Sequence, residues 1–151
     1  MRVVHSLLVQ DDQILLLFKP SRQKWFLPGW KAECGENIIQ TGLREFYEET
    51  GLQLKHAKLG AITTVVVEEE LEKKEWMLYT VKATDSTGEL IEENREGSLA
   101  WHSLKEVDEL PMFEGDRFII KKLLESDLPI VSTQIYTPTY ELIELIQNTD
   151  E

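Results

Sequence analysis

Residues 29–52 of the chain read GWKAECGENIIQTGLREFYEETGL, and they carry the strongest structural signal in the sequence. Asn37 can cap a helix from Ile38 to Thr50, and Gly51 stands where a left-handed residue commonly ends a helix. At about 100° per residue, the two sides of this helix differ in chemistry. One side carries Ile39, Leu43, Phe46, Tyr47 and Thr50, and the opposite side carries Glu45, Glu48 and Glu49. We therefore expect a helix with a core face and an acidic face.

The acidic face brings like charges together. Glutamates three and four residues apart repel one another, which destabilises an isolated helix by about 0.2–0.5 kcal/mol per pair. A bound cation removes that repulsion, and carboxylate ligands without histidine or cysteine favour magnesium or manganese over zinc. The helix alone also fits an ordinary glutamate-rich surface in water. The residues around it decide between the two interpretations.

The whole run resembles the sequence motif of the Nudix (MutT-like) hydrolase family, Gly-x5-Glu-x7-Arg-Glu-U-x-Glu-Glu-x-Gly-U, in which U is a bulky aliphatic residue. The positions that match in register are Glu36, Arg44, Glu45, Glu48, Glu49, Gly51 and Leu52. Chance agreement at the six Glu, Arg and Gly positions is on the order of once per million starting points. Two positions depart from the motif. Phe46 stands at an aliphatic position, and Trp30 replaces the first glycine, although Gly29 before it is retained.

The resemblance implies a hydrolase that uses a divalent metal, Mg²⁺ with Mn²⁺ as the alternative, to cleave a nucleoside diphosphate linked to another group. The expected metal ligands are the carbonyl of Gly29 and the side chains of Glu45, Glu48, Glu49 and a remote carboxylate, Glu96. Glu92 and Glu93 compete with Glu96 for the remote position, and a plain solvated loop is equally open there. Trp30 bears on rate and substrate geometry more than on metal binding.

The resemblance also assigns catalytic and supporting roles. Glu45 is expected to activate the attacking water, and Arg44 to orient the carboxylates. Glu36 braces the loop, Gly51 ends the helix, and Lys31 is placed to meet phosphate. A bound metal neutralises phosphate oxygens and lowers the pKa of bound water, and a carboxylate then completes proton removal.

The substrate follows from a longer resemblance, which covers most of residues 1–126. Segments 96–101 and 110–116 resemble the MutT-like nucleotide-pool branch, in which an aromatic residue and a carboxylate near the last helix read the base. Phe113 is then expected to stack on a purine and Asp116 to hydrogen-bond its edge. The alternative is that Phe113 is a core residue and Asp116 only a helix N-cap.

The expected reaction is hydrolysis of a nucleoside triphosphate, for example an oxidised purine such as 8-oxo-dGTP, to the monophosphate and pyrophosphate by attack at the β-phosphorus. The alternatives within catalysis are a nucleotide-sugar or ADP-ribose diphosphatase and an RNA 5′ pyrophosphohydrolase. The alternative from another class is a nucleotide-sensing module that barely turns over, which Trp30 motivates.

Apolar runs along the chain predict a mixed sheet covered by helices, an α/β (α+β) fold like the α/β/α sandwich of Nudix proteins. The expected strands are residues 3–9, 14–18, 61–67, 76–83 and 99–102, and a second helix is expected over residues 116–125. Residues 1–128 are expected to form the Nudix domain. Residues 129–151 are expected to be an extension that packs on the domain or a partner subunit, with a connection over residues 128–138 and a short helix over residues 139–147.

Composition narrows the class of protein. The chain has 151 residues, enough for one domain with a sizeable core, and a net charge of −12. Such a charge, without a basic stripe, argues against binding to DNA. No apolar stretch is long enough for a bilayer, and the single cysteine, Cys34, cannot form an internal disulfide. We expect a cytoplasmic protein with a nucleotide substrate and no membrane association, with a homodimer as an open alternative.

Overall fold

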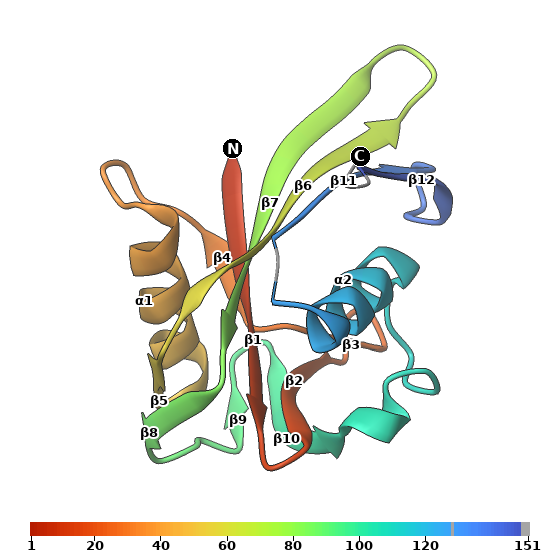
Figure 1. Ribbon diagram of the computed structural model, residues 1–151. Helices are drawn as coiled ribbons and strands as arrows, with labels where there is room; N and C mark the ends of the chain where they lie inside the picture. Colours follow the sequence, from red (N-terminus) through yellow and green to blue (C-terminus); the bar gives the residue numbers. More distant parts are fainter. Residues whose placement is uncertain (128, 149–151) are drawn as a thin grey trace.

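The computed structural model describes residues 1–127 and 129–148, and a ten-stranded mixed β-sheet runs through these residues (Figure 1). The strands lie in the order β12-β11-β6-β7-β1-β2-β10-β9, with β3 beside β2 and β4 beside β1. Their bounds are β1 Arg2–Gln10, β2 Gln13–Lys19, β3 Lys24–Phe26, β4 Gly29–Lys31, β6 Lys58–Glu68, β7 Lys73–Ala83, β9 Glu93–Asn94, β10 Gly97–Ser103, β11 Ile130–Tyr136 and β12 Leu142–Gln147. The strands β5 (Leu52–Lys55) and β8 (Asp85–Gly88) form a separate pair.

The two α-helices, α1 (Ile38–Thr50) and α2 (Glu114–Glu125), lie on opposite sides of the large sheet (Figure 1). A short 3₁₀ helix, η1 (Leu104–Glu106), precedes α2. Strand β1 pairs with β7 in parallel and with β2 through an antiparallel hairpin. Asp11 and Asp12 form its two-residue turn at φ 52° and 60°, the left-handed geometry that suits the twist of a tight hairpin. The predicted mixed sheet flanked by helices is confirmed.

Helix α1 has the predicted bounds and the predicted caps. Asn37 and Gln40 exchange the two hydrogen bonds of a capping box, and Gly51 ends the helix at φ 82°. The expectation that Tyr47 faces the core is wrong, because its side chain is 55% exposed. The small residue Gly42 packs so closely on β7 that an added Cβ would lie 2.9 Å from a methyl group of Val81. The buried side of α1 is therefore centred on Gly42. In this orientation of the helix, Tyr47 points toward solvent.

Helix α2 begins two residues earlier than predicted, with Phe113 at the N-cap position and no side-chain capping bond. Asp116 therefore lies inside the first turn, and its interpretation as the N-cap is wrong. Acidic residues in a first turn interact favourably with the helix dipole. Neither α-helix in the described residues is long and apolar enough to cross a membrane.

The end of the chain differs most from expectation. The predicted connection over residues 128–138 contains strand β11, which pairs in parallel with β6 from Ile130↔Ala61 to Tyr136↔Val67. The predicted helix over residues 139–147 is wrong, since this segment contains β12, paired antiparallel with β11. A short apolar stripe does not distinguish a helix from a strand, and hydrogen bonding to β6 and β11 decides here. Residues 128 and 149–151, where the expected domain boundary and the chain end fall, lie outside the described residues.

Candidate active site

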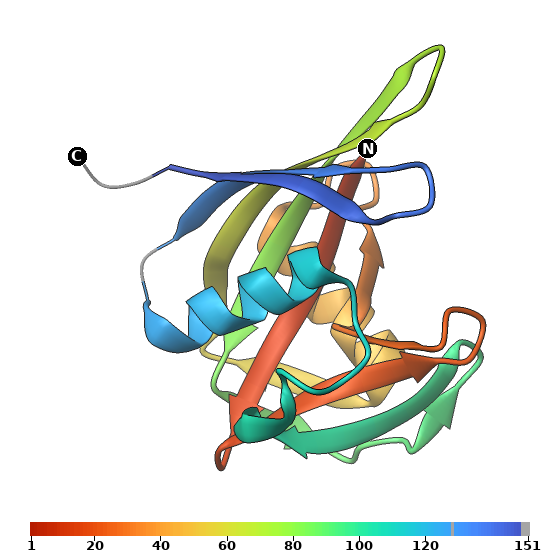
Figure 2. The ribbon, with the colours of Figure 1, turned by 90° about the vertical axis from the view of Figure 1, so that its right-hand side faces the viewer.

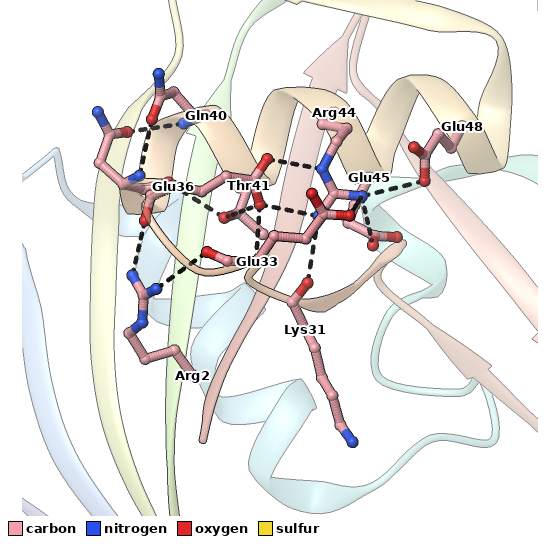
Figure 3. Close-up of polar contacts among 10 residues, drawn as sticks. Arg2, Lys31, Glu33, Glu36, Gln40, Thr41, Arg44, Glu45 and Glu48 are labelled. Atoms are coloured by element: carbon pink, nitrogen blue, oxygen red, sulfur yellow. Dashed lines mark hydrogen bonds and ion pairs between the residues drawn. The ribbon is translucent and has the colours of Figure 1, made fainter.

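Arg44 on α1 is the centre of a polar cluster (Figure 3). Its Nε donates to Glu36 Oε2 at 2.7 Å, and its Nη2 donates to Glu36 Oε1 at 2.9 Å. Its Nη1 donates to Glu45 Oε1 at 3.0 Å and to Glu48 Oε2 at 3.2 Å. A planar guanidinium holds a carboxylate with two parallel bonds, which adds geometric precision to the attraction. Arg44 thus fixes the preceding loop to the helix and orients two of the helix glutamates.

Glu36 joins the loop to the first turn of α1. Its Oε1 accepts a hydrogen bond from the backbone N–H of Glu33 at 2.9 Å and from the hydroxyl of Thr41 at 3.0 Å. The hydrogen bond from Arg44, followed by the one from Glu33, lowers the pKa of the Glu36 carboxyl to about 2. Arg2 donates from Nη1 to the Glu36 carbonyl at 2.9 Å, which ties the same loop to β1. The carboxylate of Glu36 is therefore fully ionised and structurally fixed at neutral pH.

Strand β4 brings Gly29 and Trp30 to the mouth of the site. A Cβ on Gly29 would lie only 2.0 Å from the carbonyl oxygen of Val4, so this close approach of two strands requires glycine. Trp30 pairs with Val4 in ordinary strand geometry and has no positive φ, although it stands where the family motif has glycine. Its side chain is 53% exposed and lines the cavity described below. The substitution therefore adds an aromatic wall without straining the backbone.

Glu49 is the least compensated carboxylate of the helix. Its Oε2 is buried and has no hydrogen-bond partner. Burial, and then the nearby carboxylates of Glu96 and Glu45, raise the pKa of Glu49 to about 8. A backbone hydrogen bond from Gly29 and the charge of Lys19 act in the opposite direction. This position needs either a proton or a cation.

The turn between β9 and β10 places Glu96 opposite Glu49. Asn94 Nδ2 donates to the carbonyl of Glu49 at 2.9 Å, and Asn94 Oδ1 accepts from the backbone of Glu96 at 2.8 Å and of Gly97 at 3.1 Å. Glu96 lies 3.5 Å from the ammonium group of Lys19 and lines the cavity. Glu92 and Glu93 do not line it. One asparagine side chain therefore connects the remote turn to the end of α1.

A cavity of about 780 Å³ links this acidic end to the predicted base-reading residues. Gly29, Trp30 and Glu96 line one part of it, and Phe113 and Asp116 line another. Burial raises the pKa of Asp116 to about 7, although the charge of Lys19 opposes the rise. The volume of the cavity is within the range typical of small-ligand sites. The structure thus brings residues from β4, the β9–β10 turn and α2 around one space.

A family model described as the NUDIX domain matches residues 1–123. The chain belongs to the Nudix family. It is 36% identical over 143 residues, 94% of this chain and 90% of the relative, to an uncharacterized Nudix hydrolase, YvcI, of Bacillus subtilis (strain 168). It is also 36% identical over 96 residues, 60% of this chain and 42% of the relative, to a putative 8-oxo-dGTP diphosphatase 3 of Mycobacterium tuberculosis.

Solved structures of Nudix proteins share the fold. The MutT protein of Bacillus halodurans matches with a TM-score of 0.94 and 42% identity, covering 99% of both chains. The NUDIX domain of NrtR from Shewanella oneidensis, solved with ADP ribose, matches with a TM-score of 0.68 over 83% of this chain and 86% of that one. At 19% identity the second match shows the fold alone. The protein is therefore a MutT-like Nudix hydrolase by family and structure.

Nudix hydrolases generally use divalent metals, which carboxylate and carbonyl oxygens hold. Within residues 1–127 and 129–148, no three acidic, histidine or cysteine side chains are already gathered as ligands of one ion. Arg44 instead draws Glu45 and Glu48 toward itself. The partnerless Oε2 of Glu49, close to two further carboxylates, nevertheless has the oxygen chemistry and negative charge that Mg²⁺ requires.

Sequence reasoning missed several residues of the cavity wall, and some predicted site residues, Glu45, Glu48 and Glu49 among them, do not line the cavity. Lys31 does not line the cavity, and its ammonium group lies 5.5 Å from the ring of Trp30. Three other cations, Lys19, Arg22 and Arg95, do line it. Asn94 has a recognisable signal, since an asparagine three residues before a glycine is typical of a side-chain-closed turn. The cations carry no such signal, because only the fold brings them together.

Proposed function

We propose that this Nudix hydrolase converts nucleoside triphosphates, with oxidised purines such as 8-oxo-dGTP as candidate substrates, to the monophosphate and pyrophosphate in the presence of Mg²⁺. The observation that carries the proposal is the cavity of about 780 Å³, which Glu96, close to Glu49, lines at one part and Phe113, Tyr140 and Asp116 line at another. A nucleotide has the same two-part chemistry, a phosphate chain and a base. The putative 8-oxo-dGTP diphosphatase among the relatives supports this substrate class.

In this proposal the metal ligands are the carbonyl of Gly29 and the side chains of Glu45, Glu48, Glu49 and Glu96. The bound ion supplies charge neutralisation for the phosphate oxygens and a lower pKa for coordinated water. Arg44 bonds only Oε1 of Glu45, so Oε2 is free of that contact. The ammonium group of Lys19 forms an ion pair with Glu96, and its positive charge also acts on the Asp116 carboxyl. Lys19 is therefore placed to attract the phosphate chain.

Glu45 is the proposed proton acceptor. Burial raises its pKa, and the hydrogen bond from Arg44 opposes that rise. A carboxylate of higher pKa binds a proton more firmly, which makes it the better general base. Water would attack the β-phosphorus, the bond from that phosphorus to the α–β bridging oxygen would break, and the monophosphate would leave with the bridging oxygen. Glu45 would take the proton from the attacking water.

A second candidate function is nucleotide binding with little turnover. Two features favour it: Trp30 lines the cavity at the position where the family motif has glycine, and Arg44 holds Glu45 and Glu48 in ion pairs. A sensor needs the base-reading part of the cavity but not a gathered set of metal ligands. The two candidates therefore differ in turnover and agree in binding.

The deciding experiment is a substrate panel with two readouts, pyrophosphate release and formation of the nucleoside monophosphate. The panel contains canonical and oxidised nucleoside triphosphates, ADP-ribose, a nucleotide sugar and a 5′-triphosphorylated RNA, each with and without Mg²⁺. We expect Mg²⁺-dependent pyrophosphate release from triphosphates. Formation of the monophosphate from ADP-ribose or the nucleotide sugar alone, or pyrophosphate release from RNA alone, would replace the proposed substrate class. Calorimetric binding of triphosphates with no turnover on any substrate would establish the sensor function instead.

A further inference from the structure

The C-terminal hairpin, β11–β12, lies beyond residues 1–123, which match the family model, yet it reaches the cavity. Its turn projects to the same side of the molecule as the loop between β2 and β3 (Figure 2). Tyr140 in that turn lines the cavity together with Phe113, Asp116 and Arg22. The hairpin therefore supplies a wall of the space that the Nudix core shapes on its other sides.

Tyr140 extends the aromatic surface begun by Phe113. The two ring centroids lie 6.0 Å apart with planes tilted by 39°, and the ring of Phe26 meets Phe113 edge-on at 5.6 Å. The guanidinium of Arg22 lies 5.6 Å from the Tyr140 ring centroid, which is within reach of a cation–π interaction. This contact joins the hairpin turn to the β2–β3 loop. Tyr140 is thus held in place from both sides of the cavity.

The backbone of Tyr140 is strained. Its φ is +64°, in the left-handed region where a bulky residue is an outlier and where glycine or asparagine costs less. The turn enforces this geometry with hydrogen bonds from Tyr140 N to the Thr137 carbonyl at 2.9 Å and from Thr137 N to the Glu141 carbonyl at 2.9 Å. Strained residues of this kind are concentrated at ligand-binding sites. The ring of Tyr140 therefore occupies the cavity wall at a cost to folding.

The hairpin is also anchored to the base-reading end of α2. Gln134 Nε2 donates to the carbonyl of Gly115 at 2.9 Å, and Tyr136 donates to Gln134 Oε1 at 2.6 Å, both inside the core. A Cβ on Gly115 would lie 1.8 Å from the Tyr136 hydroxyl oxygen, so glycine permits this approach. Asp116 follows Gly115 directly. These hydrogen bonds therefore fix the position of the hairpin relative to Asp116.

We infer that Tyr140 is a specificity-determining residue that stacks on the nucleobase beside Phe113 and favours purines over pyrimidines. A purine offers two fused rings, so it can cover both aromatic side chains, whereas a pyrimidine covers one. Every base can stack on an aromatic side chain, but the strength of the stacking grows with the area of the rings. The inference rests on the proposed nucleotide-hydrolase function. It adds to that function an element outside the family match.

The test measures binding rather than turnover. Calorimetry titrates α,β-methylene analogues of GTP and UTP, which cannot be cleaved at the α–β bridge, into the wild-type protein, Tyr140→Asn, Tyr140→Phe and the control Tyr47→Asn. Tyr47 is exposed on α1 and does not line the cavity. We expect Tyr140→Asn to weaken binding of the GTP analogue about tenfold and of the UTP analogue by less than about threefold. Tyr140→Phe and Tyr47→Asn should remain within about twofold of wild type.

Thermal unfolding of the same variants separates stacking from misfolding. Asparagine tolerates a positive φ, which offsets stability lost with the ring contacts to Phe113 and Tyr136, so Tyr140→Asn should melt close to the wild-type protein. Equal losses for both analogues, or GTP-analogue binding unchanged in Tyr140→Asn, would overturn the inference. So would a wild-type protein that binds neither analogue. Turnover in the substrate panel is a separate test of the proposed function. Purine-selective binding without turnover would support the role of Tyr140 and contradict the proposed reaction.

Discussion

The loop and helix of residues 29–52 and the hairpin of residues 130–147 both face the cavity, but different interactions hold them. In the first region Arg44 bonds Glu36, Glu45 and Glu48, all within eight positions of it along the chain. In the second, β11 depends on pairing with β6, and Gln134 depends on Gly115. The locally held region carries the proposed chemistry, and the remotely held region carries the proposed choice of base. Changes in the first should therefore lower kcat, and changes in the second should raise KM.

The largest effect is expected from Glu49→Gln. Removing a proposed metal-binding carboxylate should lower kcat by about 10²–10³-fold, because the developing phosphate charge loses part of its compensation. Without Mg²⁺ at pH 8 the variant should melt no lower than the wild-type protein, since the buried Oε2 of Glu49 has no partner to lose. Pyrophosphate release and calorimetric melting measure the two effects. Glu93→Gln, outside the cavity, is the matched control and should change kcat by less than about twofold.

Full activity in Glu49→Gln would remove Glu49 from the metal site. A comparable loss in Glu93→Gln would show that acidic charge in general, rather than this carboxylate, determines the rate. A second readout is the rise in melting temperature when Mg²⁺ is added, which binding to the folded state produces. That rise should be smaller in Glu49→Gln than in Glu93→Gln.

Arg44→Lys should produce the next largest effect. Lysine cannot form the two-bonded contact that Arg44 makes with Glu36, so the loop and the helix glutamates lose a common anchor. We expect kcat to fall about tenfold to a hundredfold and the free energy of unfolding to fall by about 1–3 kcal/mol. Arg2→Lys is the control, because Arg2 bonds only backbone carbonyls of the same loop. Equal effects from the two variants would mean that Arg44 merely braces the loop.

Gln134→Leu examines the hairpin region. Its side chain is buried and bonds both Gly115 and Tyr136, so leucine removes a donor from the Gly115 carbonyl and the acceptor of the Tyr136 hydroxyl, which costs about 1–3 kcal/mol of stability. Because the network lies next to Asp116, KM for purine triphosphates should rise several-fold while kcat at saturation stays within about twofold. Steady-state kinetics and denaturant unfolding check both parts. A loss confined to kcat would contradict the division between the two regions.

The sequence predicted the first region well because its signals are local. Asn37 and Gly51 cap α1 where expected, and the spacing of the glutamates places Glu45 near Glu49, which also has Glu96 close to it. The exception is Tyr47, whose exposure follows from the tight contact between Gly42 and Val81, a contact that periodicity alone does not reveal. The mixed sheet with flanking helices also followed from the pattern of apolar runs.

The second region was predicted wrongly for a physical reason. Leu142, Ile143 and Ile146 form a stripe at helical spacing, but this short segment gains its hydrogen bonds from β11. In β11 every second residue is buried, and two of these, Ser132 and Gln134, are polar, so an apolar search passes over the strand. Lys19, Arg22 and Tyr140 likewise reach the cavity only because distant strands meet. Non-local pairing determines these positions, and a single sequence carries little record of it.

The smallest effect is a pH dependence that comes from Asp116. Burial raises its pKa from 3.8 to about 7, so the folded protein keeps a proton there that the unfolded chain releases above about pH 4. The stability contributed by this proton is complete below pH 4 and is lost as the pH rises through 7. Asp116→Asn cannot titrate, so its free energy of unfolding should fall less steeply than that of the wild-type protein between pH 5 and pH 7. The difference in slope should be at most about 1.4 kcal/mol per pH unit.

Denaturant unfolding at pH 5, 6, 7 and 8 without Mg²⁺ measures these slopes. Glu49 also has a raised pKa and contributes in the same direction, but it is present in both proteins, so the comparison isolates Asp116. Parallel curves for the wild-type protein and Asp116→Asn would show that Asp116 keeps its ordinary pKa and is open to water. A steeper fall for the wild-type protein than for Asp116→Asn would show that the base-reading end of the cavity is dry enough to hold a neutral carboxyl. In that state Asp116 can donate a hydrogen bond to a base edge as well as accept one.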